Sequence, residues 1–186
     1  DIYDIVEIKP KLYRIFIADA TGHGIQAALT TMLLKSEYDK IRYFELPPNE
    51  LLEIFNNTFI ENYYNLNVFF TCFIIDIDLN KEKIIYSSAG HPEQYLVVDK
   101  DIHTLKAGGK MIGIAENMKY ELLSADFKKE NKIILFTDGI FEEFSEDKQE
   151  LGPERFKLVV YENRLKPLDE IISGILEDVD KWIGRA

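Results

Sequence analysis

The chain has 186 residues, of which 46% are hydrophobic and 30% are charged, a balance typical of one globular domain with a sizeable core. Its formal net charge of -11 argues against a nucleic-acid-binding surface, because phosphate backbones require clustered Lys and Arg. An anionic ligand can still bind if a metal ion supplies positive charge locally. No apolar run approaches the roughly 18 to 20 residues that span a bilayer, so we expect no membrane contact by this domain.

A single cysteine, Cys72, rules out a disulfide within the chain. It lies in the apolar run VFFTCFII, which predicts a buried, unreactive thiol and a reducing, cytoplasmic location. Because the sequence opens on Asp1 rather than Met, we expect a piece of a longer protein. A membrane-anchored sensor protein is one kind of protein to which this domain could belong.

Two strands and two helices are predicted first. The β-rich runs IYDIVEI and LYRIFIA flank KPK and predict a hairpin. From residue 23 the apolar spacing becomes helical, with a stripe formed by Ile25, Ala28, Leu29, Met32, Leu33 and Ser36. After the break at ELPP, a second helix is expected to start at Asn49 or at the prolines before it, with Leu52, Phe55 and Phe59 on one face.

The middle of the chain is rich in strands. The run NVFFTCFIIDID is too continuously apolar for a half-exposed strand and predicts a central one. Further strands are expected in KIIYSSAG, QYLVVD, YELLSADF and KIILFTD, followed by an acidic loop over residues 144–156. The C-terminal helix has an apolar stripe that we expect in the core, formed by Leu168, Ile171, Ile172, Ile175, Leu176, Val179 and Trp182. Strands joined by short polar turns, with helices inserted early and late, predict an α+β fold with antiparallel sheets.

Two aspartates end apolar strands and are candidates for chemistry. Asp19 follows RIFIA, Asp138 follows KIILFT, and the small residues Ala20 and Gly139 come next. A buried strand holds such a carboxylate rigidly, and nearby backbone carbonyls can face the same cavity. Hard cations such as Mg2+ and Mn2+ prefer this all-oxygen environment.

The ordinary interpretation of each feature alone is structural. A strand-end aspartate is usually a turn former or a helix cap, and paired glycines usually mark a helix start. A single loop histidine such as His91 is more often a capping residue than a ligand, and three histidines without paired cysteines argue against zinc.

Six short blocks occur in order through nearly the whole chain: DIYD, ADATGHG, SSAGHPEQYL, GGKMIGI, LFTDGIFEE and ELGPERF. Each is weak alone. Together they resemble the bacterial SpoIIE/RsbU-type branch of the metal-dependent, type-2C-like serine/threonine protein phosphatases, the PPM family.

The resemblance implies an α-β-β-α sandwich of two antiparallel sheets flanked by helices, with a two-metal site for Mn2+ or Mg2+ at one end. Asp19 would be the bridging ligand, the carbonyl of Ala20 would help to hold the second metal, and Asp138 and Asp1 would be further ligands. Asp4 matches the second acid of the opening motif and has a weaker claim to direct coordination. The other candidates would surround the site: Gly22, His23, Gly24, Gly90, His91 and Gly139.

The resemblance also implies the reaction. Two metals acidify a water, which attacks the phosphorus of a phosphoserine or phosphothreonine without a covalent intermediate. The substrate would be a phosphorylated signalling protein of the anti-anti-sigma (STAS) type, and an N-terminal sensor domain often precedes the catalytic domain.

The chain departs from the family pattern at both ends. It begins at the first aspartate, without two preceding glycines, and stops at KWIGRA, before an Asp-Asp-x-Thr strand that supplies another ligand. We therefore expect residues 1–186 to form a single phosphatase-like domain that lacks the start of the first motif and the last strand. Two alternatives remain: a catalytically weak or inactive phosphatase-fold module that regulates or binds, and an unrelated α+β domain whose aspartates are only caps.

Overall fold

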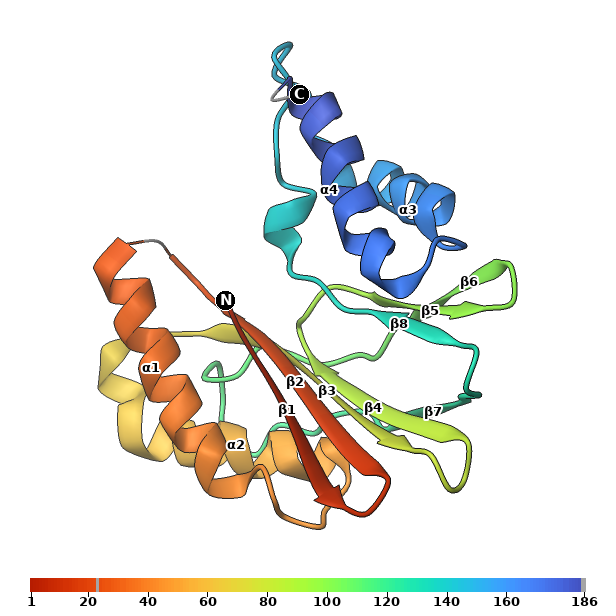
Figure 1. Cartoon of the computed structure of the whole chain (residues 1–186). Helices are drawn as coiled ribbons and strands as arrows, with labels where there is room; N and C mark the ends of the chain where they lie inside the picture. The colour runs from red at the N-terminus through yellow and green to blue at the C-terminus, as the bar shows by residue number, and fades with distance from the viewer. Residues whose placement is uncertain (23, 185–186) are drawn as a thin grey trace. The chain divides into compact units, whose positions relative to one another are not determined.

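The computed structural model describes residues 1–22 and 24–184 and divides the chain into two compact units (Figure 1). The first unit comprises residues 1–93 and 105–129, and the second comprises residues 94–104 and 130–186. Each unit has its own antiparallel sheet and its own cluster of buried hydrophobic side chains. The predicted α+β class with antiparallel sheets is confirmed, and the described residues form two such sheets and four α-helices.

The sheet of the first unit has five strands in the order β1-β2-β3-β4-β7, and every neighbouring pair is antiparallel. The strands are β1 (Ile2–Lys9), β2 (Leu12–Ala20), β3 (Phe70–Asp78), β4 (Lys83–Ala89) and β7 (Leu123–Asp126). The opening hairpin is confirmed, and β3 occupies the middle of the sheet, as its unbroken apolar run predicts. Short polar turns explain the antiparallel pairing of β1 with β2 and of β3 with β4.

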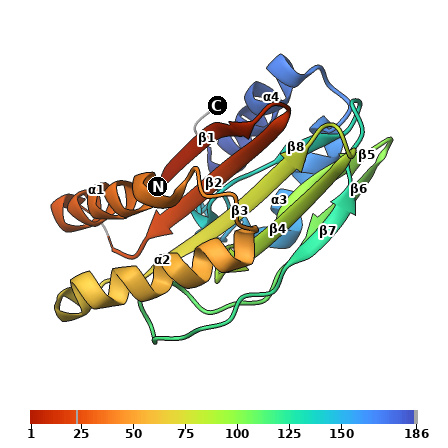
Figure 2. The same ribbon diagram turned by 90° about the horizontal axis from the view of Figure 1, so that it is seen from below.

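Helices α1 (Gly24–Ile41) and α2 (Pro48–Tyr63) lie along one face of this sheet, and the short helix η1 (Tyr64–Leu66) follows α2 (Figures 1 and 2). Alternate residues of each strand point to that face, and there they bury Phe16 of β2 and Phe70 of β3 completely. Tyr38 of α1 stacks on Phe16 with ring centroids 3.9 Å apart, and Phe55 of α2 contacts both Phe16 and Phe70. Aromatic packing therefore joins both helices to the sheet.

The buried face of α1 differs from the predicted stripe. Ile25, Leu29 and Met32 are 82%, 57% and 69% exposed. The residues that face the core are instead Thr30, Leu34, Glu37, Tyr38 and Ile41. The prediction was wrong on this point because two polar-tipped side chains, Glu37 and Tyr38, make the tertiary contacts, and counting apolar spacing ignores them.

The second unit combines the three-stranded sheet β6-β5-β8 with helices α3 and α4. Its elements are β5 (Gln94–Val98), β6 (Asp101–Leu105), β8 (Lys132–Ile134), η2 (Asp138–Ile140), α3 (Gly152–Asn163) and α4 (Leu168–Ile183). Phe156 of α3 is the centre of an aromatic cluster with Tyr95, Phe136 and Phe141. The core of this unit therefore links β5, α3 and the segment after β8.

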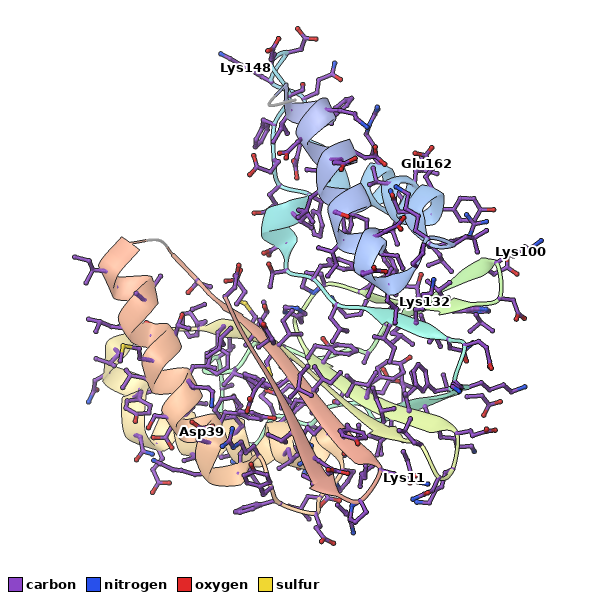
Figure 3. All side chains as sticks on the ribbon, in the orientation of Figure 1. Lys11, Asp39, Lys100, Lys132, Lys148 and Glu162 are labelled. Atoms are coloured by element: carbon purple, nitrogen blue, oxygen red, sulfur yellow. The ribbon has the colours of Figure 1, made fainter. Side chains whose placement is uncertain are left out.

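Side-chain hydrogen bonds connect the short strand β8 to its surroundings. The buried amide of Gln94 accepts from the backbone N–H of Phe136 at 2.8 Å and donates to its carbonyl at 3.0 Å, which continues the pairing past Ile134. Lys132, labelled in Figure 3, donates to the carbonyls of Arg164 and Lys166 just beyond α3. These carbonyls lack helical partners, so the lysine satisfies them.

Three features of the second unit were not predicted correctly. Strand β6 and helix α3 were not anticipated, and α3 begins inside the segment assigned to a loop. Helix α4 is confirmed, but only Ile171, Ile175 and Val179 of its stripe are buried, while Leu168, Ile172 and Leu176 are 69%, 69% and 48% exposed. A search of the described helices finds none that combines the length and the apolar character required to cross a membrane.

Candidate active site

Asp19 and Asp1 lie together at one edge of the first unit's sheet. β1 and β2 are antiparallel, so the start of β1 and the end of β2 meet there, with Ile2 paired to Ala18. The amino group of Asp1 lies 3.7 Å from Oδ1 of Asp19, whose side chain is 28% exposed. Asp19 is thus held in a strand that is flanked by β1 and β3, lies close to Asp1, and remains accessible to solvent.

The turn after Asp19 is fixed by the backbone. Ala20 is buried, and the N–H and hydroxyl of Thr21 both donate to the carbonyl of Phe69, at 3.1 and 2.9 Å. Gly22 and Gly24 have φ angles of 98° and 77°, in the left-handed region that favours glycine. A Cβ at either position would meet nothing within 4 Å, so these glycines serve the turn and not a close approach. His23 lies outside the described residues.

His91 reaches the Asp19 edge through Thr71. Thr71 is the register partner of Asp19 on β3, and its hydroxyl lies 2.8 Å from Nδ1 of His91. The backbone N–H of His91 also donates to Ser88 Oγ at 3.2 Å, and the residue is 7% exposed. Gly90 has φ 70°, and a Cβ there would lie 2.8 Å from Cγ of Met111.

Thr71 was not identified from the sequence. A hydroxyl inside the apolar run VFFTCFII was a signal, but its importance depends on the β2–β3 register. In that register Thr71 stands opposite Asp19, which places the Ser88–His91 turn near the same edge.

Asp4 takes part in an ion pair on α1's side of the sheet. Its Oδ2 accepts from Nη1 of Arg42 at 2.9 Å and lies 3.7 Å from Nζ of Lys35. The hydrogen bond to Asp4 raises the pKa of Arg42. Asp4 therefore links β1 to α1 and to Arg42, which follows that helix.

Asp138 and Gly139 lie in the second unit, where they begin η2. The carbonyl of Asp138 accepts from the N–H groups of Phe141 and Glu142, at 2.9 and 3.0 Å. This turn keeps the Asp138 side chain partly exposed, and Gly139 is exposed. Asp138 follows β8 after a gap, because β8 ends earlier than the run KIILFTD predicts.

The donor chemistry at the Asp19 edge suits a hard divalent cation. Asp1 and Asp19 offer carboxylate oxygens, and such oxygens are the ligands that Mg2+ and Mn2+ prefer. Within the described residues, neither unit by itself gathers three acidic, histidine or cysteine side chains in metal-binding geometry.

Cys72 is unsuited to nucleophilic catalysis. It is fully buried on the helix-covered face of the first sheet. Burial raises the pKa of its thiol well above the ordinary value. The reactive thiolate is therefore disfavoured, as its place in an apolar strand predicts.

The fold has counterparts among type-2C phosphatase domains. The SiaA-PP2C domain of Pseudomonas aeruginosa superposes with a TM-score of 0.87 and 20% identity, covering 98% of this chain and 73% of that domain. RsbX in complex with magnesium superposes with a TM-score of 0.67 and 16% identity, covering 98% of this chain and 79% of that one. These likenesses establish the PP2C-type fold.

Sequence comparison identifies the family. The family model of Stage II sporulation protein E (SpoIIE) matches residues 9–186, so the chain belongs to the SpoIIE family. Phosphoserine phosphatase RsbU of Bacillus subtilis (strain 168) is 28% identical over 183 residues, which cover 97% of this chain. The chain spans about half of RsbU, since the match covers 54% of that protein. The resemblance read from the six sequence blocks is confirmed.

Proposed function

We propose that this chain is the catalytic domain of a metal-dependent protein phosphatase that hydrolyses phosphoserine or phosphothreonine. The match to the SpoIIE family over residues 9–186 carries this proposal. It is supported by RsbU, a phosphoserine phosphatase that matches 97% of the present chain. The position of Asp19 supports it, since a rigid strand end with an accessible carboxylate is what a metal site requires.

In this proposal Asp19, Asp1, the Ala20 carbonyl and Asp138 hold Mn2+ or Mg2+. When bound, the metal neutralises phosphate charge and lowers the pKa of the water that attacks phosphorus. The strand pairing of β2 with β1 and β3 keeps Asp19 in place, and the Thr21 bonds to Phe69 fix the turn that follows. Magnesium in the RsbX complex supports a divalent metal for this fold.

The substrate that the family likeness favours is a phosphorylated STAS-domain protein of the anti-anti-sigma type. The net charge of -11 agrees with a need for metal ions, since the domain by itself repels a phosphate dianion. A sensor domain N-terminal to this chain would control the activity, as the partial coverage of RsbU allows.

The test is metal-dependent hydrolysis of p-nitrophenyl phosphate and of a phosphorylated STAS protein, with any native flanking sequence retained. Asp19→Asn and Asp138→Asn are each expected to lower kcat/KM at least about 100-fold, because each removes a metal ligand. Asp126→Asn is the matched control, since Asp126 is also an exposed strand-end aspartate and lies outside the proposed site.

Calorimetric titration with Mn2+ gives a second measurement that does not depend on turnover. Asp19→Asn is expected to weaken Mn2+ binding, whereas Asp126→Asn is not. Full activity in both Asp19→Asn and Asp138→Asn would refute the site. No binding at millimolar Mn2+ would instead favour an inactive, regulatory member of the fold.

A further inference from the structure

A pocket of about 130 Å³ lies in the first unit, where the C-terminal end of α2 meets the chain before β3. Helix α2 contributes Phe59 and Ile60, which are 1% and 4% exposed. Tyr64 and Ile114 also line it and are 69% and 41% exposed. The pocket thus has a buried apolar base and a rim that mixes apolar and polar groups, since Asn67 also lines it, and none of its described lining residues carries a charge.

Hydrogen bonds to a buried side chain hold the rim residue Ile114 in place. The Asn56 amide accepts from the N–H of Gly113 at 3.0 Å and donates to the carbonyl of Ala115 at 2.8 Å. Asn56 is fully buried, and its two bonds bracket Ile114 on both sides. Gly113 has φ 94°, and a Cβ there would lie 2.7 Å from the carbonyl oxygen of Val68, so this wall tolerates glycine alone. The pocket is therefore built before any ligand arrives.

The same pocket is connected to the Asp19 edge. Phe69, one of its lining residues, accepts both hydrogen bonds from Thr21, two residues after Asp19. Thr71 stands opposite Asp19 in the β2–β3 register and follows Phe69 by two residues, a span of roughly 7 Å along a strand. Phe70 exchanges backbone hydrogen bonds with Ile112, which fixes the 112–114 segment to the same strand end.

The geometry points to a substrate subsite: this pocket receives one apolar side chain, such as Leu or Met, of the phosphoprotein whose phosphoserine lies at Asp19. The inference rests on the proposed phosphatase function. An extended peptide covers about 3.3–3.6 Å per residue, so the occupant lies roughly two to four residues from the phosphoserine. An apolar cavity of roughly 150 Å³ accommodates a benzene ring, so this volume suits a single side chain.

The subsite is tested with alanine-based phosphoserine peptides in which one leucine is moved through each position up to about four residues on either side of the phosphoserine. Turnover of p-nitrophenyl phosphate is measured in parallel, because this small substrate does not reach the pocket. Leucine at one or two adjacent positions is expected to raise kcat/KM about tenfold over the leucine-free peptide, through burial of its side chain.

Ile114→Glu places a charge on the rim and is expected to abolish the leucine preference, lowering peptide kcat/KM about tenfold relative to that for p-nitrophenyl phosphate. Tyr64→Ser gives a second, more exposed rim variant and is expected to weaken the same preference. Leu79→Glu is the matched control, because Leu79 is 45% exposed and follows β3 at the end opposite Thr71.

Three outcomes would overturn the subsite. A flat leucine profile with active p-nitrophenyl phosphate hydrolysis removes the subsite and leaves the phosphatase function intact. An unchanged leucine preference in both Ile114→Glu and Tyr64→Ser places the apolar contact elsewhere. Absence of hydrolysis of every phosphate substrate by the parent protein refutes the proposed function and, with it, this inference.

Discussion

Arg14 is a fully buried charged side chain in the first unit, and its contacts explain how the sheet can contain it. Its Nε and Nη2 donate to the two carboxylate oxygens of Asp76 at 2.7 and 2.6 Å. Its remaining N–H groups donate to the carbonyls of Arg42, Phe44 and Leu46 in the α1–α2 connection. The planar guanidinium therefore binds a neighbouring strand and an irregular loop at once, which a lysine cannot do.

We expect Arg14→Met to lower the free energy of unfolding by about 3–5 kcal/mol, because it leaves the buried carboxylate of Asp76 without its cation. Burial raises the pKa of Asp76, and the loss of Arg14, which opposes that shift, should raise it further. Urea denaturation measures the change. An NMR titration of the Asp76 carboxyl group measures the expected rise in its pKa.

The control for Arg14→Met is Lys9→Met, which makes the same change of charge in the exposed pair between Lys9 and Glu45. The Lys9 and Glu45 side chains are 46% and 64% exposed, so Lys9→Met is expected to lower the free energy of unfolding by less than about 1 kcal/mol. Equal costs for the two variants would show that burial of the Arg14 pair is not what makes it important.

At the scale of elements, Glu37 joins helix α1 to helix α2. Its carboxylate accepts from the Tyr63 hydroxyl at 2.6 Å and from Nζ of Lys40 at 2.7 and 2.8 Å. The side chain is 2% exposed. Burial alone would raise the pKa of Glu37, but the hydrogen bonds from Lys40 and Tyr63 outweigh it and lower the pKa.

This lowered pKa gives the contact a defined pH dependence. Ionised Glu37 stabilises the fold above the ordinary value of 4.5, and that contribution is lost as the pH falls through the folded-state pKa. Glu37→Gln should therefore cost about 1–3 kcal/mol at neutral pH, with the difference from the parent protein shrinking below 4.5. Urea unfolding across that range measures it.

Asp39→Asn provides the comparison for Glu37→Gln, since Asp39 lies on the same helix with its side chain 41% exposed, where it pairs with Lys35 and Arg42. Its cost should be below about 1 kcal/mol. A Glu37→Gln penalty that stays constant as the pH falls would mean that ionisation of Glu37 does not contribute.

Element by element, the sequence predicted what depends on local pattern. The β1–β2 hairpin, the central β3 and the start of α2 at Pro48 follow from alternation, apolar runs and proline chemistry. The buried face of α1 did not follow, because Tyr38 finds its partner, Phe16, through tertiary packing. Helix α3 was missed because its first turn, GPERF, continues an acidic, turn-rich segment.

The candidate site shows the same division. Asp19 and its glycine turn are local features, and the family resemblance alone is enough to single them out. The proximity of Asp1 follows from the predicted hairpin, whose antiparallel strands place both residues at one edge. Three features could not be predicted: the position of Thr71 opposite Asp19, the hydrogen bonds of Asn56 to Gly113 and Ala115, and the pocket. They depend on the β2–β3 register and on contacts between residues more than 50 positions apart.

At the scale of the whole chain, the two units have separate hydrophobic cores. Phe55 belongs to the cluster of the first unit, formed by α1, α2 and the sheet, and is 1% exposed. Phe156 belongs to the cluster of the second unit and is also 1% exposed. The chain crosses between the units near residues 93, 104 and 129, so each core is assembled from more than one stretch of sequence.

Separate cores predict separate responses to core truncation. Phe156→Ala removes a ring that lies 4.8 Å from that of Phe136, centroid to centroid, and should cost about 3–5 kcal/mol. Hydrogen–deuterium exchange should then accelerate in β5, β8 and α4, with β2 and β3 much less affected. Phe55→Ala, a matched truncation at equal burial, should give the reverse pattern. If both variants accelerated exchange equally in both units, the two cores would open as one cooperative structure and the division into two units would have no energetic meaning.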